Sequence, residues 1–180
     1  MILAGWQINV MPSLRTGFAF TAATAIYRSR DGQGGGADRP NLAPGMSNNP
    51  STGTTSGCAG VPAGQKLQTV ERYYDPCAFV LPDLGTYGNL GANTIIGPGF
   101  VNFDMAVHKT FNFTERINLQ FRGEFFNLFN TANFGDFARS IFRSATGGPN
   151  GTPLYNGSAG RILQTINTSR QIQFGLKLSF

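Results

Sequence analysis

The sequence contains no long apolar run and little charge. No stretch of about 18 apolar residues occurs, which excludes a transmembrane helix. The first six residues lack the charged and apolar regions of a secretory signal peptide. Charged residues make up only 13% of the 180 residues, whereas roughly a quarter is usual. A soluble surface would normally carry more charge than this.

The patterns of several common binding sites are also missing. The net charge of +5 comes mostly from scattered arginines and not from a basic run, so nucleic-acid binding is not supported. No phosphate-binding glycine pattern follows a strand, and we interpret the glycines at 34–36 as a flexible turn. Cys58 and Cys77 show no CxxC spacing, which argues against zinc. They form either a loop disulfide in an oxidising compartment or two free thiols.

Catalytic constellations are absent as well. His108 is the only histidine, and Asp104 would share its face of a strand. Four residues along a strand span about 13 Å, however, which is too far for direct contact. No Ser/His/Asp or Cys/His arrangement can be argued from spacing. We therefore expect no enzymatic activity, no metal site and no cofactor.

The clearest pattern is a two-residue alternation in the last eleven residues, 170–180, within a strand predicted at about 168–180. Apolar residues occupy one parity, at Ile172, Phe174, Leu176, Leu178 and Phe180, and mostly polar residues the other. A period of two predicts a strand. Its length and pattern match a membrane-spanning strand of a β-barrel, which needs about 9 to 11 tilted residues. An amphipathic strand in a soluble sheet is the alternative.

Three further strands are predicted at about 2–14, 100–111 and 116–129. The last two form a hairpin whose apolar residues have odd numbers, so the hairpin loop must contain an odd number of residues. A three-residue loop at 112–114 sets Asp104 opposite Arg122, a favourable pair. A loop moved one residue later sets Asp104 opposite Glu124. We favour the first register.

Two long connections, at about 27–99 and 131–167, are rich in glycine, proline, serine and asparagine. Within the first, the aromatic run at 73–79 is expected to fold back onto another part of the chain. The residues after the first strand, 15–21, could extend it beyond a membrane surface, so the end of this strand stays open. Long, short and long connections follow in turn, as in barrels with long extracellular loops and short periplasmic turns. We therefore predict an all-β, antiparallel transmembrane β-barrel fragment of four strands with two long extracellular loops.

Several segments resemble the carboxy-terminal end of TonB-dependent outer-membrane receptors, in particular Oar-like receptors with a carboxypeptidase-regulatory-like domain. The resemblance is carried by residues 88–104, 109–111, 119–130 with the run FFNLFN at 125–130, 133–135 and 170–180. It implies a piece of a 22-stranded barrel whose lumen holds a plug domain. A four-stranded sheet would leave open edges in lipid, so we expect residues 1–180 to be a fragment, starting at an internal methionine.

The resemblance further implies a function, a location and partners. We expect part of the wall and external loops of a receptor for energised nutrient uptake, in the bacterial outer membrane. The expected partners are outer-membrane lipid, the remaining barrel and plug, the barrel-assembly machinery and, through the plug, TonB. The terminal strand, with Phe174, Leu176, Leu178 and Phe180, would be the assembly signal. The polar residues expected to face the lumen are Asp104, His108, Arg122, Glu124 and Lys177. A structural or adhesive surface protein and a small soluble β-domain are the alternatives, and the transported substrate cannot be read from the sequence.

Overall fold

The computed structural model describes residues 4–32 and 38–180. The chain is all-β, with antiparallel strand pairs and two short 3-10 helices, η1 (Pro76–Ala78) and η2 (Pro149–Gly151), which confirms the predicted fold class. None of the helices in these residues is long and apolar enough to cross a membrane. The chain divides into two compact units. Unit 1 comprises residues 1–16, 99–133 and 165–180, and unit 2 comprises 17–98 and 134–164.

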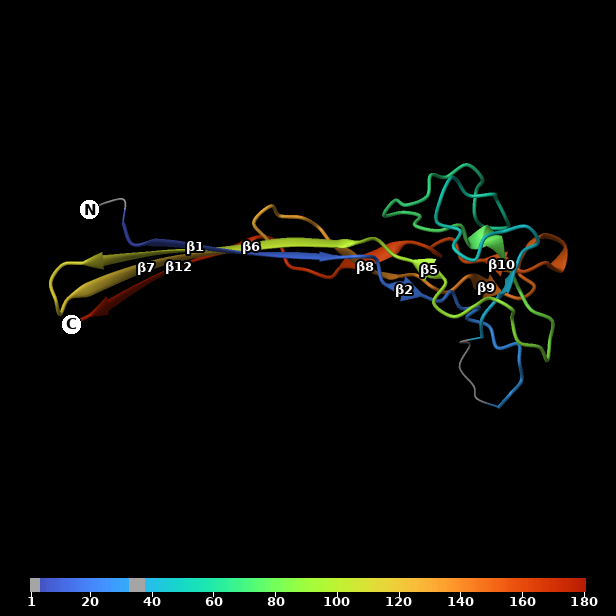
Figure 1. Ribbon diagram of the computed structural model, residues 1–180. Coiled ribbons are helices and arrows are strands. Elements are labelled where there is room, and N and C mark those ends of the chain that lie inside the picture. The colour runs from blue at the N-terminus through green and yellow to red at the C-terminus, as the bar shows by residue number, and fades with distance from the viewer. Residues whose placement is uncertain (1–3, 33–37) are drawn as a thin grey trace. The chain divides into compact units, whose positions relative to one another are not determined.

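Unit 1 is a four-stranded antiparallel sheet with the order β1-β6-β7-β12. Its strands are β1 (Trp6–Arg15), β6 (Phe100–Asn112), β7 (Asn118–Phe126) and β12 (Gln171–Ser179), which lie side by side in Figure 1. They correspond to the four predicted strands. The predicted range 2–14 begins too early, and the ranges 116–129 and 168–180 are too long at both ends. Residues 2 and 3 of the first range lie outside the described residues.

The register places most of the apolar residues of all four strands on one face of the sheet. Even-numbered residues of β1 lie opposite odd-numbered residues of β6, so that Ile8 pairs with Val107. Odd residues of β6 and β7 then pair with each other, and even residues of β12 pair with odd residues of β7, as Leu176 does with Phe121. Because neighbouring residues on a strand point to opposite faces, the polar residues gather on the other side.

The hairpin between β6 and β7 differs from the predicted register. Its loop has five residues, 113–117, so His108 lies opposite Arg122 and Ala106 opposite Glu124. The predicted pairs of Asp104 with Arg122 or with Glu124 are therefore both wrong, although the loop length is odd as predicted. The longer loop is stabilised by Thr114, whose Oγ1 accepts hydrogen bonds from the backbone N–H groups of Arg116 (3.3 Å) and Ile117 (3.0 Å).

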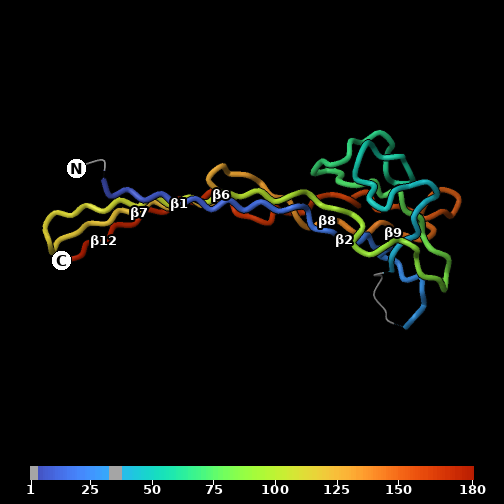
Figure 2. Tube along the Cα trace, viewed as in Figure 1, coloured from blue at the N-terminus to red at the C-terminus, as the bar shows by residue number. Residues whose placement is uncertain are grey.

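Unit 2 is built from the segments between β1 and β6 and between β7 and β12, which contain the two predicted connections and are folded and not open loops; its Cα trace can be followed in Figure 2. Its short strands pair as β2 (Ala19–Phe20) with β5 (Ile95–Ile96), β3 (Asn41–Leu42) with β4 (Phe79–Val80), β8 (Phe134–Phe137) with β11 (Ile162–Thr165), and β9 (Phe142–Ser144) with β10 (Leu154–Tyr155). The extension of the first strand through 15–21, which the sequence left open, does not occur, because β1 ends at Arg15 and Ala19–Phe20 pairs with β5. The glycines at 34–36 lie outside the described residues.

An aromatic core holds unit 2 together. The aromatic run predicted to fold back supplies Tyr73, Tyr74 and Phe79 to this core. Phe20, in the segment between β1 and β6, stacks on Phe137 from the second connection, with ring centroids 4.5 Å apart. Burial of such rings is the main favourable contribution that a small core can make. The two connections are thus a single folded body.

Candidate functional site

The apolar face of unit 1 is the first part of the candidate site. Nothing in the described chain covers it, and Phe174 and Leu176 are 70% and 72% exposed. These two belong to the predicted assembly strand with Leu178 and Phe180; Phe180 follows the last residue of β12. Phe174 also packs beside Phe121, at a centroid distance of 6.0 Å. Four neighbouring strands that expose apolar side chains in this way need an apolar surrounding, because soluble proteins seldom expose such a large contiguous patch.

The height of this face matches a membrane. Along β6 the apolar side chains run from Val101 to Phe111, which are ten residues apart. At about 3.3 Å per residue and a strand tilt of about 40°, this distance corresponds to roughly 25 Å across the bilayer. Outer-membrane barrels carry an apolar band of about this height. The sheet is therefore long enough to cross a bilayer once with each strand.

The polar face brings together the five residues predicted to face a lumen. His108 lies opposite Arg122, Glu124 opposite Gln173, and Lys177 opposite Gln120. Arg122 and Glu124 follow each other on this face of β7 and form an ion pair of 2.5 Å. Asp104 belongs to the same face, opposite Met11. Cations and carboxylates alternate here, so the face carries a mixed charge and not a patch of one sign.

Asp104 does not serve as a cross-strand ion partner. Its Oδ1 accepts hydrogen bonds from the backbone N–H of Asn127 (2.8 Å) and from Nδ2 of Asn102 (3.0 Å). Asn127 directly follows β7 and has a positive φ of 51°, a conformation that asparagine tolerates better than most residues. Asp104 thus fixes the turn in which β7 ends.

Several apolar side chains interrupt the polar face, among them Met11 and Phe126. Met11 is 65% exposed opposite Asp104, and Phe126 lies exposed at the end of β7. Together with His108 and Arg122 they line a shallow depression in this face. Met11 and Phe126 thus add apolar area beside the charged residues of this face.

Hydrogen bonds of asparagine side chains stabilise the end of the sheet from which the second connection leaves. Nδ2 of Asn127 donates to the carbonyl oxygens of Thr131 (3.1 Å) and Thr168 (2.9 Å). Nδ2 of Asn167 donates to the same Thr131 oxygen (2.8 Å), and Oδ1 of Asn130 accepts from the backbone N–H of Arg170 (2.9 Å). The outgoing and returning chain are thereby held together. The sequence indicated these hydrogen bonds only through the two asparagines of the FFNLFN run.

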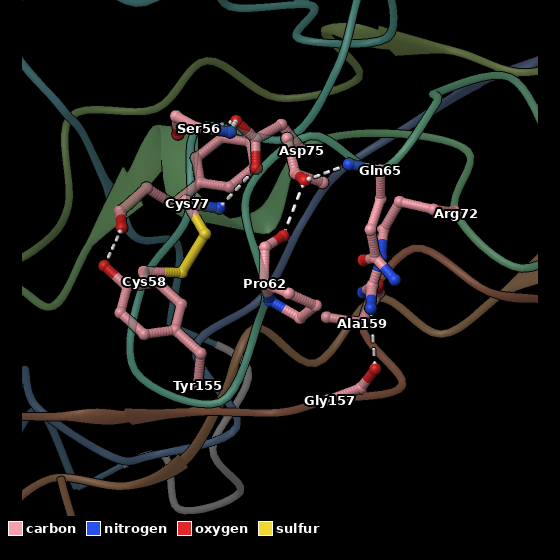
Figure 3. The surroundings of a disulfide bond; sticks show 12 residues. Ser56, Cys58, Pro62, Gln65, Arg72, Asp75, Cys77, Tyr155, Gly157 and Ala159 are labelled. Atoms are coloured by element: carbon pink, nitrogen blue, oxygen red, sulfur yellow. Dashed lines mark hydrogen bonds between the residues drawn. A yellow bond between two sulfur atoms is a disulfide. The ribbon is translucent and has the colours of Figure 1, made fainter.

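In unit 2, Cys58 and Cys77 form a disulfide with a Cα–Cα distance of 5.6 Å (Figure 3). The sequence had left a disulfide and two free thiols open. Buried Asp75 lies beside it, and its carboxylate accepts hydrogen bonds from the backbone N–H (2.9 Å) and Oγ (2.8 Å) of Ser56 and from the N–H of Cys77 (3.0 Å). The hydroxyl of Tyr155 donates to the carbonyl of Phe79 (2.7 Å). The disulfide thus joins two segments that are already hydrogen-bonded.

A buried arginine closes the same region of unit 2. Arg72 donates from Nε to Oε1 of Gln65 (3.2 Å) and from its terminal nitrogens to the carbonyls of Gly157 (2.8 Å) and Ala159 (Figure 3). Burial lowers the pKa of this guanidinium, and burial likewise raises the pKa of the Tyr74 hydroxyl far above its usual range. Arg72 therefore cross-links loops; no catalytic partner lies among its contacts.

Metal ligation finds no support in the part of the chain that the structure describes. Within residues 4–32 and 38–180, no three His, Cys, Asp or Glu side chains come together in a way that could hold an ion. Asp104 and His108, whose pairing the sequence already argued against, lie on one face of β6 with Ala106 between them.

An antiparallel sheet with one uncovered apolar face of bilayer height and one polar face defines a membrane-embedded β-structure. The chain belongs to the outer membrane beta barrel domain family, whose model matches residues 1–173. The protein is accordingly located in the bacterial outer membrane. No curated protein and no solved structure matches the chain.

Proposed function

We propose that the chain forms part of the wall and external loops of a TonB-dependent receptor for energised nutrient uptake. The observation that carries this proposal is the sorting of side chains by the register, with most apolar residues of all four strands on one face and the charged residues other than Lys109 on the other. The apolar face contacts outer-membrane lipid, and the polar face turns to the lumen. On this proposal the protein is no enzyme and needs no cofactor.

The open edges support a larger barrel. Among the described strands, β1 and β12 each have one neighbour in the sheet. Unpaired backbone groups at these edges would cost several kcal/mol each in lipid, so further strands must pair with them. These strands come from the remaining barrel of the receptor. The same free edge makes β12 the segment that the barrel-assembly machinery recognises by adding a strand.

A plug domain is the proposed occupant of the polar face. Met11 and Phe126 are exposed there beside Asp104 and the Arg122–Glu124 pair, which suits contact with a protein surface better than contact with water alone. TonB acts on this plug and supplies the energy for uptake. A structural or adhesive surface protein is the second candidate, and the compact core and disulfide of unit 2 favour it as a module for binding partners.

Cysteine labelling tests the orientation of the faces. Both native cysteines are joined in the disulfide, so a single introduced cysteine is the reactive one. In outer membranes, a water-soluble maleimide should label Gln173→Cys and spare Phe174→Cys until detergent is added. Glu115→Cys in the exposed hairpin loop is the control for access of the reagent. Equal labelling of positions 173 and 174 in the membrane would contradict the proposal.

Cross-linking separates transport from adhesion. A photoreactive amino acid at Met11 should cross-link to a plug segment of the same receptor, whereas one at the neighbouring Val10 should label lipid. The two positions have opposite faces and similar exposure, which makes Val10 a matched control. Cross-links from Met11 to a separate protein, or to none, would favour the structural or adhesive alternative.

A further inference from the structure

One cation lies on the otherwise apolar face. Lys109 belongs to the odd-numbered residues of β6, and its neighbours across the sheet are Trp6 on β1 and Phe121 on β7. It is only 2% exposed, although it is surrounded by residues that face outward. The two-residue alternation alone would have placed an apolar side chain here.

The surroundings of Lys109 are suited to an ammonium group that has little water. Its Nζ lies 5.1 Å from the ring centroid of Trp6 and 5.3 Å from that of Phe111, distances at which a cation is attracted to the ring. Nζ also donates a hydrogen bond to the carbonyl oxygen of Ala4. Ala4 and Phe111 both lie nearer to the hairpin end of the sheet than Lys109 itself, so the ammonium is directed toward that end.

The membrane limits where such a group can lie. A lysine on the lipid face of a barrel costs about 2–4 kcal/mol at the bilayer midplane and about 0–1 kcal/mol near an interface. Long cationic side chains therefore extend toward the headgroups, and tryptophan also prefers this boundary. If the ammonium lies at the height of Phe111, the apolar band from there to Val101 has the roughly 25 Å that a bilayer requires.

We infer that Trp6, Lys109 and Phe111 form an anchor on the headgroup boundary of the leaflet at the hairpin end and thereby fix the depth of the sheet. The partner is the glycerol and phosphate region of glycerophospholipids, which the half-exposed ring of Trp6 contacts while the buried ammonium of Lys109 holds that ring in place. This inference rests on the proposed lipid contact of the apolar face. It adds the position of one membrane boundary along the strands.

The chain contains its own probe, because Trp6 is the single tryptophan. The complete barrel, with any tryptophan outside this chain replaced by phenylalanine, is reconstituted into phosphatidylcholine vesicles whose acyl chains carry bromine either near the headgroup or near the terminal methyl. Trp6 fluorescence should be quenched more strongly by the shallow bromines. In Lys109→Met, Trp6 should lie deeper by up to roughly 5 Å, the height of two residues along a tilted strand, and its quenching should shift toward the deep bromines. Lys177→Met on the polar face, the matched control, and Lys109→Arg, which keeps the cation, should leave the profile unchanged.

The outcomes distinguish the anchor from the proposed function. Emission typical of water, without quenching by either lipid, would overturn lipid contact and the anchor together. Quenching that is stronger from the deep bromines in the unmodified protein would overturn the anchor alone. An unchanged profile in Lys109→Met would show that Lys109 does not set the depth. The comparison in the unmodified protein decides the position even if that variant does not fold.

Discussion

The side-chain amide of Asn133 pairs with both backbone groups of Val101. Oδ1 of Asn133 accepts from the N–H of Val101 (2.7 Å), and Nδ2 donates to its carbonyl oxygen (2.9 Å). One asparagine thus imitates a neighbouring strand beside the beginning of β6. The backbone N–H of Asn133 donates in turn to Oδ1 of Asn167 (2.9 Å), and its carbonyl accepts from Ile166 (2.9 Å).

Asn133→Ala should destabilise the sheet. The substitution removes two hydrogen bonds from a site where Asn133 is 3% exposed, and each is worth about 1 kcal/mol, so a loss of roughly 2 kcal/mol is expected. Urea unfolding of the reconstituted protein measures this loss. Asn112→Ala, at the exposed end of β6, is the control and should change the stability little. Equal effects of the two substitutions would show that the pairing with Val101 contributes nothing.

Removal of the disulfide should weaken unit 2. Cys58 and Cys77 are 19 residues apart, and closing a loop of this length stabilises a protein by about 3 kcal/mol in the chain-entropy description. The Cys58→Ala/Cys77→Ala double variant should therefore lose near-ultraviolet circular dichroism of the aromatic core at lower denaturant concentration. Reductant should reproduce this loss in the unmodified protein and have no effect on the double variant. If neither the double variant nor the reduced protein loses its circular dichroism at a lower denaturant concentration, the prediction is wrong.

Asp38 should make unit 2 sensitive to acid. Burial acts to raise the pKa of its carboxyl group, but hydrogen bonds from the backbone N–H groups of Ser29 (2.8 Å) and Arg28 (2.6 Å) and from Oγ of Ser29 (2.9 Å) outweigh burial and lower the pKa below the ordinary 3.8. A lowered pKa in the folded state stabilises the fold above the unfolded pKa.

That stabilisation should disappear as the pH falls from about 5 through 3.8 and on through the lower folded pKa. Denaturant unfolding of unit 2, followed by its aromatic signals between pH 6 and pH 2, measures the slope. Asp38→Asn should flatten it, whereas Asp83→Asn, another loop carboxyl of unit 2, should retain it. A slope that Asp38→Asn leaves unchanged would assign the acid sensitivity to other groups.

Deletion of Phe180 should reduce insertion into the outer membrane and leave the sheet intact. Phe180 lies beyond β12 and is almost fully exposed, so it contributes no ladder hydrogen bond. A defect would therefore reflect recognition by the assembly machinery. The amount of protein in the outer-membrane fraction is the readout. Phe113→Ala, at an exposed hairpin position, is the control, and normal levels after the deletion would remove Phe180 from the signal.

The alternation of side chains predicted most of unit 1, because parity alone decides which face a residue occupies. Ile8, Val107 and Leu176 share a face as their numbers required. Parity does not determine which residues lie opposite each other. That depended on the five-residue loop that Thr114 stabilises, and so Arg122 lies opposite His108 and not opposite Asp104.

Contacts between distant segments could not be read from the sequence. Phe20 and Phe137, which stack on each other, are more than a hundred residues apart in the sequence, and neither lies in a segment with a regular period. Lys109 was missed because it breaks the parity on which the strand prediction relied. The asparagines at 127, 130, 133 and 167 act through backbone groups, for which no side-chain pattern gives the partner.

The cross-link between Cys58 and Cys77 also bears on the order in which the protein acquires its structure. Both cysteines belong to the same connection, so their oxidation requires neither the second connection nor any strand of the sheet. The sheet, by contrast, can separate its two faces only where lipid is present. Loop 58–77 can therefore be closed covalently during transit through an oxidising compartment, while the four long strands are still unpaired.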